Sequence, residues 1–373
     1  MKYSLFATSF SGLALSFALL GTSSKAADRV TVYTMDNATN GNHVLIFQQL
    51  ENGKITNSGS IETGGAGSGG GGLASQGSIQ ISSDARWLFV CNAGSDEISV
   101  FQIRKNGLEL SDKVSSGGQM PVSLALRNNL LYVVNAGGTV GGTDNITAFT
   151  FENGRLSALA QSTRPVSGAF TTPTDAVFTQ DGKVLIVTER DTTNIDTYTI
   201  ASDGLATTHQ VFISPGAKPF GFAAGGHDRI FVSEAAGVPG ASSASSYNVS
   251  DKGDLTIISP TNSTKQQAPC WLVLTPDERF AYTANASSGT LSAFAVSRDG
   301  DLNLLDFNGI TGNIDTGSHP VDMAVSADGQ FLFSLANGNG TLNLFKISCD
   351  GALVYLDSLD GISTNAAGLA IQP

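Results

Sequence analysis

The chain has 373 residues, of which 41% are hydrophobic and only 14% are charged, and its formal net charge at pH 7 is −12. This length and apolar content allow one large all-β domain with a core of its own. The acidic balance argues against nucleic acid as a partner, because nucleic-acid binding requires a basic face. It argues in the same way against polyanionic substrates and anionic membrane surfaces.

The first 26 residues have the pattern of a secretory signal peptide. Lys2 supplies a positive charge, residues 5–20 are largely apolar, and residues 24–26 form a small-x-small cleavage sequence. The apolar stretch is short for a membrane span and is interrupted by Ser and Gly, although an uncleaved anchor is the alternative. We therefore expect a secreted or periplasmic protein without a membrane span after cleavage, in which residues 27–373 form one domain.

One phrase recurs seven times along the rest of the chain. Each copy has a short apolar run that ends in Asn or Glu, a polar gap, a second apolar run, and a turn such as Asn-Gly or Asp-Gly. The runs are short and rich in β-branched and aromatic residues, which is typical of strands. Equivalent anchor residues are separated by 43 to 56 residues, and they are Tyr33, Phe89, Tyr132, Ile186, Phe231, Tyr282 and Phe333.

This repeat predicts a β-propeller with seven blades. A period near fifty residues with two hairpins per copy corresponds to four antiparallel strands, which make one blade. The innermost strands should begin near residues 77, 122, 174, 220, 270, 321 and 366, and the second strands near 30, 86, 130, 184, 229, 279 and 330. Residues 366–371 should then pair with residues 30–35 and close one blade from both termini, which removes an open sheet edge.

A glycine-rich stretch at residues 64–72 connects an outer strand to the next innermost strand. It lacks the Gly-Lys-Ser/Thr ending of a phosphate-binding loop and precedes a strand rather than a helix. We expect a mobile loop over one mouth of the channel.

The same mouth should carry two rings of aligned residues, because innermost strands begin and second strands end on one face of four-stranded blades. The first ring is Ser78, Ser123, Asp175, Gly221, Trp271, Asp322 and Gly368. The second ring is Asn37, Asn92, Asn135, Glu189, Glu234, Asn285 and the pair Ala336-Asn337.

These rings supply the candidate site. Asp175 and Glu189 belong to one blade and should face each other, and paired carboxylates can act as general base and general acid. Glu234 and Asp322 are further catalytic candidates. The expected substrate contacts are Asn92, Asn135, Asn285, Trp271 and Arg190. The alternative is that these residues cap turns and strand ends, as Asp and Asn do in many loops.

The predicted chemistry requires no cofactor, although carboxylates and amides suit a hard cation such as calcium. The sequence has no Asp-x-Asp-x-Asp loop, and its four histidines form no zinc-binding motif. Among them, only His319 lies near the expected mouth.

Residues 82–101, 179–200 and 318–345 resemble the seven-bladed lactonase family. That family includes cytosolic 6-phosphogluconolactonases and the fungal enzymes known as 3-carboxymuconate cyclases. The resemblance covers nearly all of the chain after the signal peptide. It implies a seven-bladed propeller that hydrolyses or forms a lactone.

The chain departs from the family where the innermost strands begin. The Pro-x-His step of the family reads Pro-x-Ser, Pro-x-Asp, Pro-x-Gly or Pro-x-Trp here, and the basic candidates at the mouth reduce to Arg190, with Lys218 and Arg164 on loops. This disfavours a phosphorylated lactone or a tricarboxylate and favours a neutral lactone or a sugar-like ester. The alternative is a non-catalytic scaffold that binds a polyol, a cation or a protein partner. We expect a monomer in either case.

Overall fold

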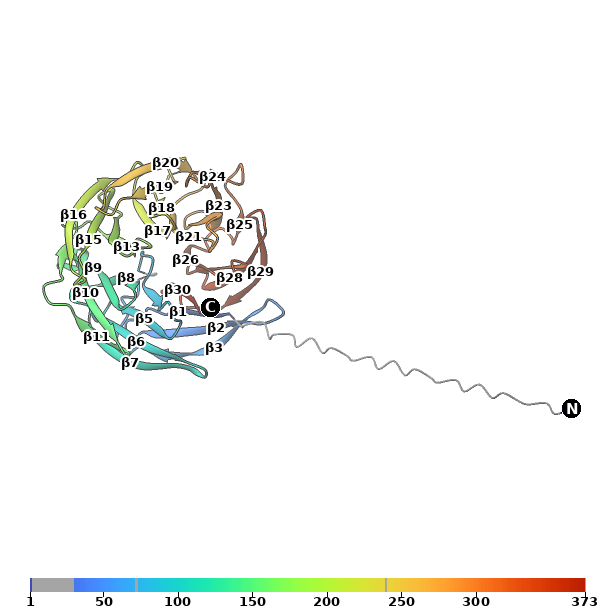
Figure 1. Cartoon of the computed structure of the whole chain (residues 1–373). Helices are drawn as coiled ribbons and strands as arrows, with labels where there is room; N and C mark the ends of the chain where they lie inside the picture. The colour runs from blue at the N-terminus through green and yellow to red at the C-terminus, as the bar shows by residue number, and fades with distance from the viewer. Residues whose placement is uncertain (2–29, 71–72, 239, 373) are drawn as a thin grey trace.

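Seven antiparallel sheets surround a central axis in the computed structural model, as Figure 1 shows. The structure describes residues 30–70, 73–238 and 240–372, together with Met1. The expected seven-bladed propeller with four antiparallel strands per blade is confirmed, and two sheets carry one further short strand. Apart from Met1, the expected signal peptide lies outside the described residues. In the described part of the chain, no helix is long and apolar enough to cross a membrane.

The blades are numbered in chain order, and their strands run from the axis outward. Blade 1 contains β30 (Ala367–Gln372), β1 (Thr31–Met35), β2 (His43–Gln49) and β3 (Ile55–Glu62). Blade 2 contains β4 (Ile79–Ile81), β5 (Trp87–Asn92), β6 (Glu97–Arg104) and β7 (Gly107–Ser115). Blade 3 contains β8 (Pro121–Arg127), β9 (Leu130–Ala136), β10 (Asp144–Glu152) and β11 (Arg155–Ala158), with β12 (Arg164–Pro165) beside β10 and the 3₁₀ helix η1 (Gly137–Val140) after β9.

The remaining blades follow the same order. Blade 4 contains β13 (Pro173–Phe178), β14 (Val184–Glu189), β15 (Asn194–Ile200) and β16 (Ala206–Ile213). Blade 5 contains β17 (Pro219–Gly225), β18 (Arg229–Glu234), β19 (Ser243–Val249) and β20 (Leu255–Ser263). Blade 6 contains β21 (Pro269–Leu274), β22 (Phe280–Asn285), β23 (Thr290–Val296) and β24 (Leu302–Leu304), with β25 (Gly312–Asn313) beside β23. Blade 7 contains β26 (Pro320–Val325), β27 (Phe331–Ala336), β28 (Thr341–Ile347) and β29 (Leu353–Asp360).

The two ends of the described chain close blade 1. β30 pairs with β1 in antiparallel register, with Val32 opposite Ile371 and Tyr33 opposite Ala370. The Tyr33 hydroxyl also donates a hydrogen bond of 3.0 Å to the Gln372 side chain. The predicted closure is confirmed, and it gives β30 and β1 hydrogen-bonding partners that an open ring would leave exposed.

In four blades, a repeated turn connects the innermost strand to the second strand on the face opposite the channel mouth. In blade 6, the Thr275 hydroxyl donates to Asp277 Oδ1 at 2.6 Å and accepts a bond from the Phe280 N–H at 3.1 Å. Such side-chain bonds favour turns over continued strand. The same Ser/Thr–Asp pair occurs in three other blades, as Ser82–Asp84, Thr179–Asp181 and Ser326–Asp328.

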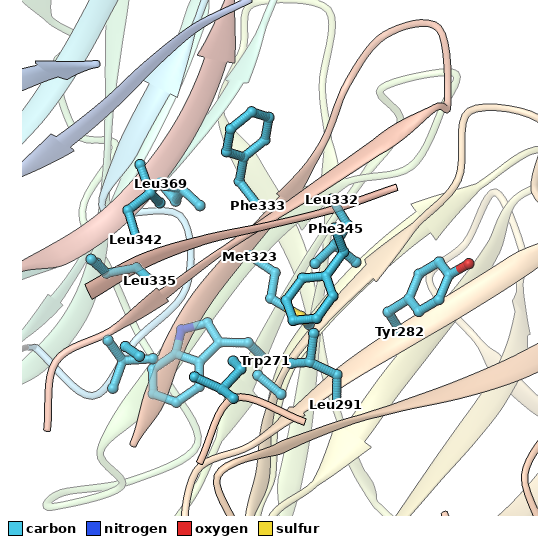
Figure 2. Packing of buried hydrophobic residues seen from close by; sticks show 14 of the residues in the cluster. Trp271, Tyr282, Leu291, Met323, Leu332, Phe333, Leu335, Leu342, Phe345 and Leu369 are labelled. Carbon is cyan, nitrogen blue, oxygen red and sulfur yellow. The ribbon is translucent and has the colours of Figure 1, made fainter. Parts of the chain in front are cut away.

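Apolar side chains between neighbouring sheets form the core. β14 and β22 are buried along their whole length, as expected for strands covered on both faces. Between blades 6 and 7, Trp271, Met323 and Leu335 belong to one cluster of buried side chains, which Figure 2 shows. Burial of each large side chain contributes ~1.5–3 kcal/mol. The blades therefore stabilise one another and hold the channel mouth in place.

Candidate functional site

A cavity of about 300 Å³ lies at the mouth of the central channel, and we call it the mouth cavity. Three basic side chains line it: Arg190 directly after β14, Lys218 directly before β17 and His319 directly before β26. Its apolar lining includes Leu73, Phe220, Trp271 and Val321. This volume is at the lower end of the range for small-molecule sites. The cavity therefore suits a small ligand with an anionic part.

Lys218 and His319 reach the mouth because of an unusual backbone conformation that recurs from blade to blade. Each precedes the proline of an innermost strand, with φ of +61° and +52° respectively. Positive φ is uncommon for residues other than glycine. The equivalent residues Met120, Thr172 and Ala268 adopt the same conformation, with φ between +52° and +56°. The fold thus uses this position to direct side chains, and only blades 5 and 7 place a basic group there.

Arg190 occupies the position that follows the end of a second strand. The aligned residues in the other blades are Ala38, Ala93, Ala136, Ala235, Ala286 and Asn337. Ala235 and Ala286 also line the mouth cavity, so this position faces the mouth. A large cation at one point of a ring made mainly of alanine is a sequence signal for a ligand contact.

Asp191 balances part of the positive charge. Its carboxylate lies 3.3 Å from Arg190 Nε and accepts a hydrogen bond of 2.7 Å from the Thr172 hydroxyl. Burial raises the pKa of Asp191, but the bond from Thr172 and the charges of Arg190 and Lys218 outweigh it and lower the pKa below its ordinary value. One carboxylate against two cations and an imidazole leaves the mouth cavity basic in an otherwise acidic protein.

The segment before β4 forms the floor of the mouth cavity. Gln76 extends across the channel, where its side-chain amide donates to the backbone oxygens of Phe222 and Leu272 and accepts from the Leu272 N–H, at 3.0 to 3.1 Å. Gly221 leaves room for it, since a Cβ there would lie 2.2 Å from Gln76 Oε1. Gln76 therefore ties blade 2 to blades 5 and 6 across the channel.

A second space of about 520 Å³ lies on the other side of Gln76, and we call it the lower chamber. Its walls are the innermost strands, and it extends to the exposed Pro276 on the opposite face. Asp175 and Asp322 line the lower chamber and do not line the mouth cavity. The expected first ring is therefore divided, because only Trp271 of its seven residues lines the mouth cavity.

The expected second ring does not line the mouth cavity either. Asn92, Asn135, Glu189, Glu234 and Asn285 are all fully buried and bind groups of their own blades or of adjoining loops. Side chains of a strand alternate between its faces, so the next residue points the other way. The prediction that these side chains line the mouth was wrong by one residue, and the position of Arg190 faces the mouth instead.

The predicted pairing of Asp175 with Glu189 was also wrong. A β-bulge between Pro173 and Asp175 shifts the register, so that Thr188 lies opposite Asp175 and Glu189 lies opposite Pro173. Asp175 accepts hydrogen bonds from the Ser123 hydroxyl and the Phe222 N–H, each at 3.1 Å. Glu189 binds the Ser167 N–H at 2.8 Å and the Thr192 hydroxyl at 2.5 Å. The two carboxylates therefore belong to separate hydrogen-bond networks.

Glu189 lies in a buried network with Asp196 and His209. Asp196 is fully buried, and its Oδ1 lies 2.6 Å from His209 Nε2. Burial raises the pKa of Asp196 to about 7, His209 opposes the shift, and the nearby Glu189 adds to it. The folded protein therefore holds this proton at pH values where the unfolded chain has lost it.

We expect Asp196→Asn to stabilise the protein at pH 8 and to have little effect at pH 4. Because the pKa is raised in the folded state, the wild-type unfolding free energy should fall as pH rises from about 4 to 7, by up to about 4 kcal/mol. The amide carries no titrating proton and removes this slope. Urea unfolding at both pH values tests the prediction, with the exposed Asp299→Asn as control. Equal destabilisation at both pH values would contradict it.

Comparison with known proteins identifies the family. Residues 26–139 and 216–360 match the family model described as lactonase, 7-bladed β-propeller. The chain belongs to this lactonase family. No curated protein matches it in sequence.

Solved structures share the fold of this chain at low sequence identity. A candidate 6-phosphogluconolactonase of Bacteroides fragilis is 19% identical with a TM-score of 0.70, covering 93% of this chain and 99% of that one. A candidate 6-phosphogluconolactonase of Bacteroides uniformis is 18% identical with a TM-score of 0.73, covering 92% and 99%. The periplasmic gluconolactonase of Pseudomonas aeruginosa is 16% identical with a TM-score of 0.70, covering 92% and 99%.

The two segments that match the family model contain some residues of the mouth cavity and leave out others. Lys218, Trp271 and His319 lie within the matched residues, whereas Arg190 lies between the two segments. From sequence, Lys218 was expected on a loop, and His319 was the one histidine expected near the mouth. The signal that could have placed Lys218 at the mouth is its position before the proline of an innermost strand, which it shares with His319.

Trp271 and Cys270 contribute little reactive surface to the mouth cavity. Trp271 is only 4% exposed, and its indole N–H donates a hydrogen bond of 2.9 Å to the Ser75 oxygen. The expected stacking of a ligand on its ring is therefore limited to an edge. Burial raises the pKa of Cys270 to about 12, against the nearby charges of Arg190 and Lys218. The thiol stays protonated at neutral pH and is a poor nucleophile.

The glycine-rich stretch has a packing role in its described part. The Gly67 N–H donates to the Ala38 oxygen at 2.8 Å, and a Cβ on Gly67 would lie 2.2 Å from the backbone of Asn37. A Cβ on Gly65 would lie 2.5 Å from the Asn92 side chain. Glycine is required here because two backbones approach closely. The expected mobile loop is thus an ordered connection over residues 64–70.

Proposed function

We propose that the protein hydrolyses a small lactone in the mouth cavity and that the substrate carries an anionic group. The observation that carries this proposal is the convergence of Arg190, Lys218 and His319 on one small concavity in a chain of the lactonase family. These groups come from three different blades. A basic cavity in a protein with a formal charge of −12 is a local arrangement that favours an anionic ligand.

In the proposed reaction, His319 acts as general base on a water molecule. The imidazole takes one proton from the water, whose oxygen attacks the lactone carbonyl carbon. The tetrahedral intermediate then breaks the bond between that carbon and the ring oxygen, and the ring oxygen receives the proton back from the imidazolium. The product is an open-chain hydroxy acid, which releases one proton to solvent at neutral pH. General base catalysis of this kind contributes about 10²–10⁴-fold in rate.

Arg190 and Lys218 supply the positive charge that this reaction needs. Negative charge develops on the carbonyl oxygen in the transition state, and a cation fixed beside it lowers the barrier. A second cation can hold a carboxylate or phosphate substituent and orient the ring. The neutral lactone expected from sequence rested on too few basic groups at the mouth, and their convergence in space favours an anionic lactone instead.

The test is proton release by the purified protein on matched pairs of sugar lactones, with and without a carboxylate or phosphate group. We expect turnover on at least one anionic member and a kcat/KM at least tenfold lower on its neutral counterpart. Turnover on neutral lactones alone would contradict the proposed specificity. Failure to turn over any lactone, with a folded protein, would favour the non-catalytic scaffold.

We expect Arg190→Ala to lower kcat/KM on the anionic lactone by about 10- to 100-fold. The reason is the loss of a charge-assisted contact worth roughly 1.5–3 kcal/mol. The matched control is Lys105→Ala, which removes one positive charge from an exposed turn outside the cavity and should leave kcat/KM unchanged. If both variants lower kcat/KM equally, Arg190 acts through the net charge of the protein and not through contact with the substrate.

A further inference from the structure

The lower chamber contains an unpaired acidic oxygen. Asp322 is 2% exposed, and its Oδ1 accepts a hydrogen bond of 2.8 Å from the Met323 N–H. Its Oδ2 makes no hydrogen bond of normal geometry with the described residues. Burial raises the pKa of Asp322 well above its ordinary value, and the charge of Asp175 adds to the rise, against the N–H groups of Met323 and Leu369. A buried carboxylate oxygen without a partner costs free energy. A ligand bound in front of Asp322 Oδ2 supplies the missing partner.

Further oxygens surround the same space. Asp175 lines the chamber on blade 4, three blades from Asp322 on blade 7, and its charge acts on Asp322. Ser78 lies between Gly77 and Ile79, which line the chamber, and its hydroxyl is fully buried and also lacks a partner among the described residues. Oxygens with negative charge are the ligands preferred by hard cations.

Two glycines let the backbone approach these oxygens closely. A Cβ on Gly77 would lie 2.9 Å from the Ser123 hydroxyl and 3.2 Å from Asp175 Oδ1, and a Cβ on Gly368 would lie 2.6 Å from the Ser78 hydroxyl. Both glycines have positive φ, of +76° and +74°. The backbone therefore packs directly against the oxygens of Asp175 and Ser78, and a larger residue at either position would displace them.

We propose that the lower chamber binds one calcium ion, with Asp175 and Asp322 as its anionic ligands and Ser78 as a neutral one. The ion neutralises two carboxylates that otherwise repel each other inside the channel. The remaining ligands are water, for which a chamber of about 520 Å³ has room. The ion enters from the face that carries Pro276, because Gln76 separates the chamber from the mouth cavity.

This site is independent of the proposed lactonase reaction. Asp175 and Asp322 line the lower chamber, and neither they nor Ser78 line the mouth cavity. A second acidic group, Asp181, Asp228 and Asp251, lies at the surface, but Lys183 already pairs with Asp181 at 2.9 Å and with Asp251 at 2.6 Å. That surface group is the competing location for added calcium.

The experiment is calorimetric titration of the metal-stripped full protein with calcium chloride, with magnesium chloride and sodium chloride at matched ionic strength. We expect one saturable calcium site, a higher melting temperature with calcium, and weaker binding of magnesium. Asp322→Asn should weaken calcium binding at least tenfold. The control, Asp251→Asn, removes a carboxylate from the surface group and should bind as the wild type does.

A second measurement locates the ion without any variant. Crystals of the wild-type protein soaked in strontium should show an anomalous peak between Asp175 and Asp322. The proposal is overturned if no saturable binding occurs, if folded Asp322→Asn binds calcium as tightly as the wild type, or if the only anomalous peak lies at Asp181, Asp228 and Asp251. Water alone in the chamber would also overturn it.

Discussion

Replacement of His319 by alanine should lower kcat on the preferred lactone by about 10²–10⁴-fold while the protein remains folded. His319 is the proposed general base, and the loss of such a group removes a contribution of this size. The side chain is exposed at the mouth, so its removal creates no internal cavity. Alanine also suits the backbone there, because Ala268 occupies the equivalent position of blade 6 with the same φ of +52°.

Two further measurements separate a chemical role from a structural one. Added imidazole should restore part of kcat in His319→Ala, because a free base can enter the vacated space, whereas KM should change much less than kcat. The matched control is Met120→Ala, at the equivalent position of blade 3, which does not line the mouth cavity. An unchanged kcat in His319→Ala would show that another group activates the water.

The second large effect concerns stability. Glu234 is fully buried and accepts hydrogen bonds from the hydroxyls of Ser214 at 2.9 Å and Ser245 at 2.6 Å, from the Gly216 N–H at 3.1 Å, and from the Ser243 hydroxyl. Glu234→Ala leaves these donors without an acceptor. We expect a loss of roughly 3–5 kcal/mol in unfolding free energy.

Thermal and urea unfolding test this prediction, with the exposed Glu152→Ala as control. The folded fraction of Glu234→Gln should retain the wild-type kcat/KM, because Glu234 does not line the mouth cavity. This outcome would show that Glu234 stabilises the fold and is not the general acid or base expected from sequence. Loss of turnover in Glu234→Gln at unchanged stability would restore the catalytic role.

The blade architecture could be predicted from sequence because each signal is local. Alternating apolar residues define the strands, Asp-Gly and Asn-Gly define the hairpins, and the spacing of anchors such as Tyr282 and Phe333 defines the repeat. The closure by β30 and β1 followed from the order of strands within the repeat. Those features need no knowledge of how one blade meets another.

The direction of the candidate side chains could not be predicted in the same way. A β-bulge follows the first proline of β8, β13, β17, β21 and β26, and it shifts the register of each innermost strand. A shift of one residue reverses which side chains face the mouth. Asp175 and Asp322 therefore lie in the lower chamber instead of at the mouth.

The sequence by itself thus determined the number of blades, the order of their strands and the closure of the ring. Only the tertiary structure decided which residues share a cavity. Arg190, Lys218 and His319 are distant in sequence and meet because three blades converge on one axis, while Gln76 divides the channel by crossing it. Strand formation depends on local periodicity, whereas the contents of a cavity depend on backbone direction at single residues and on contacts between distant blades.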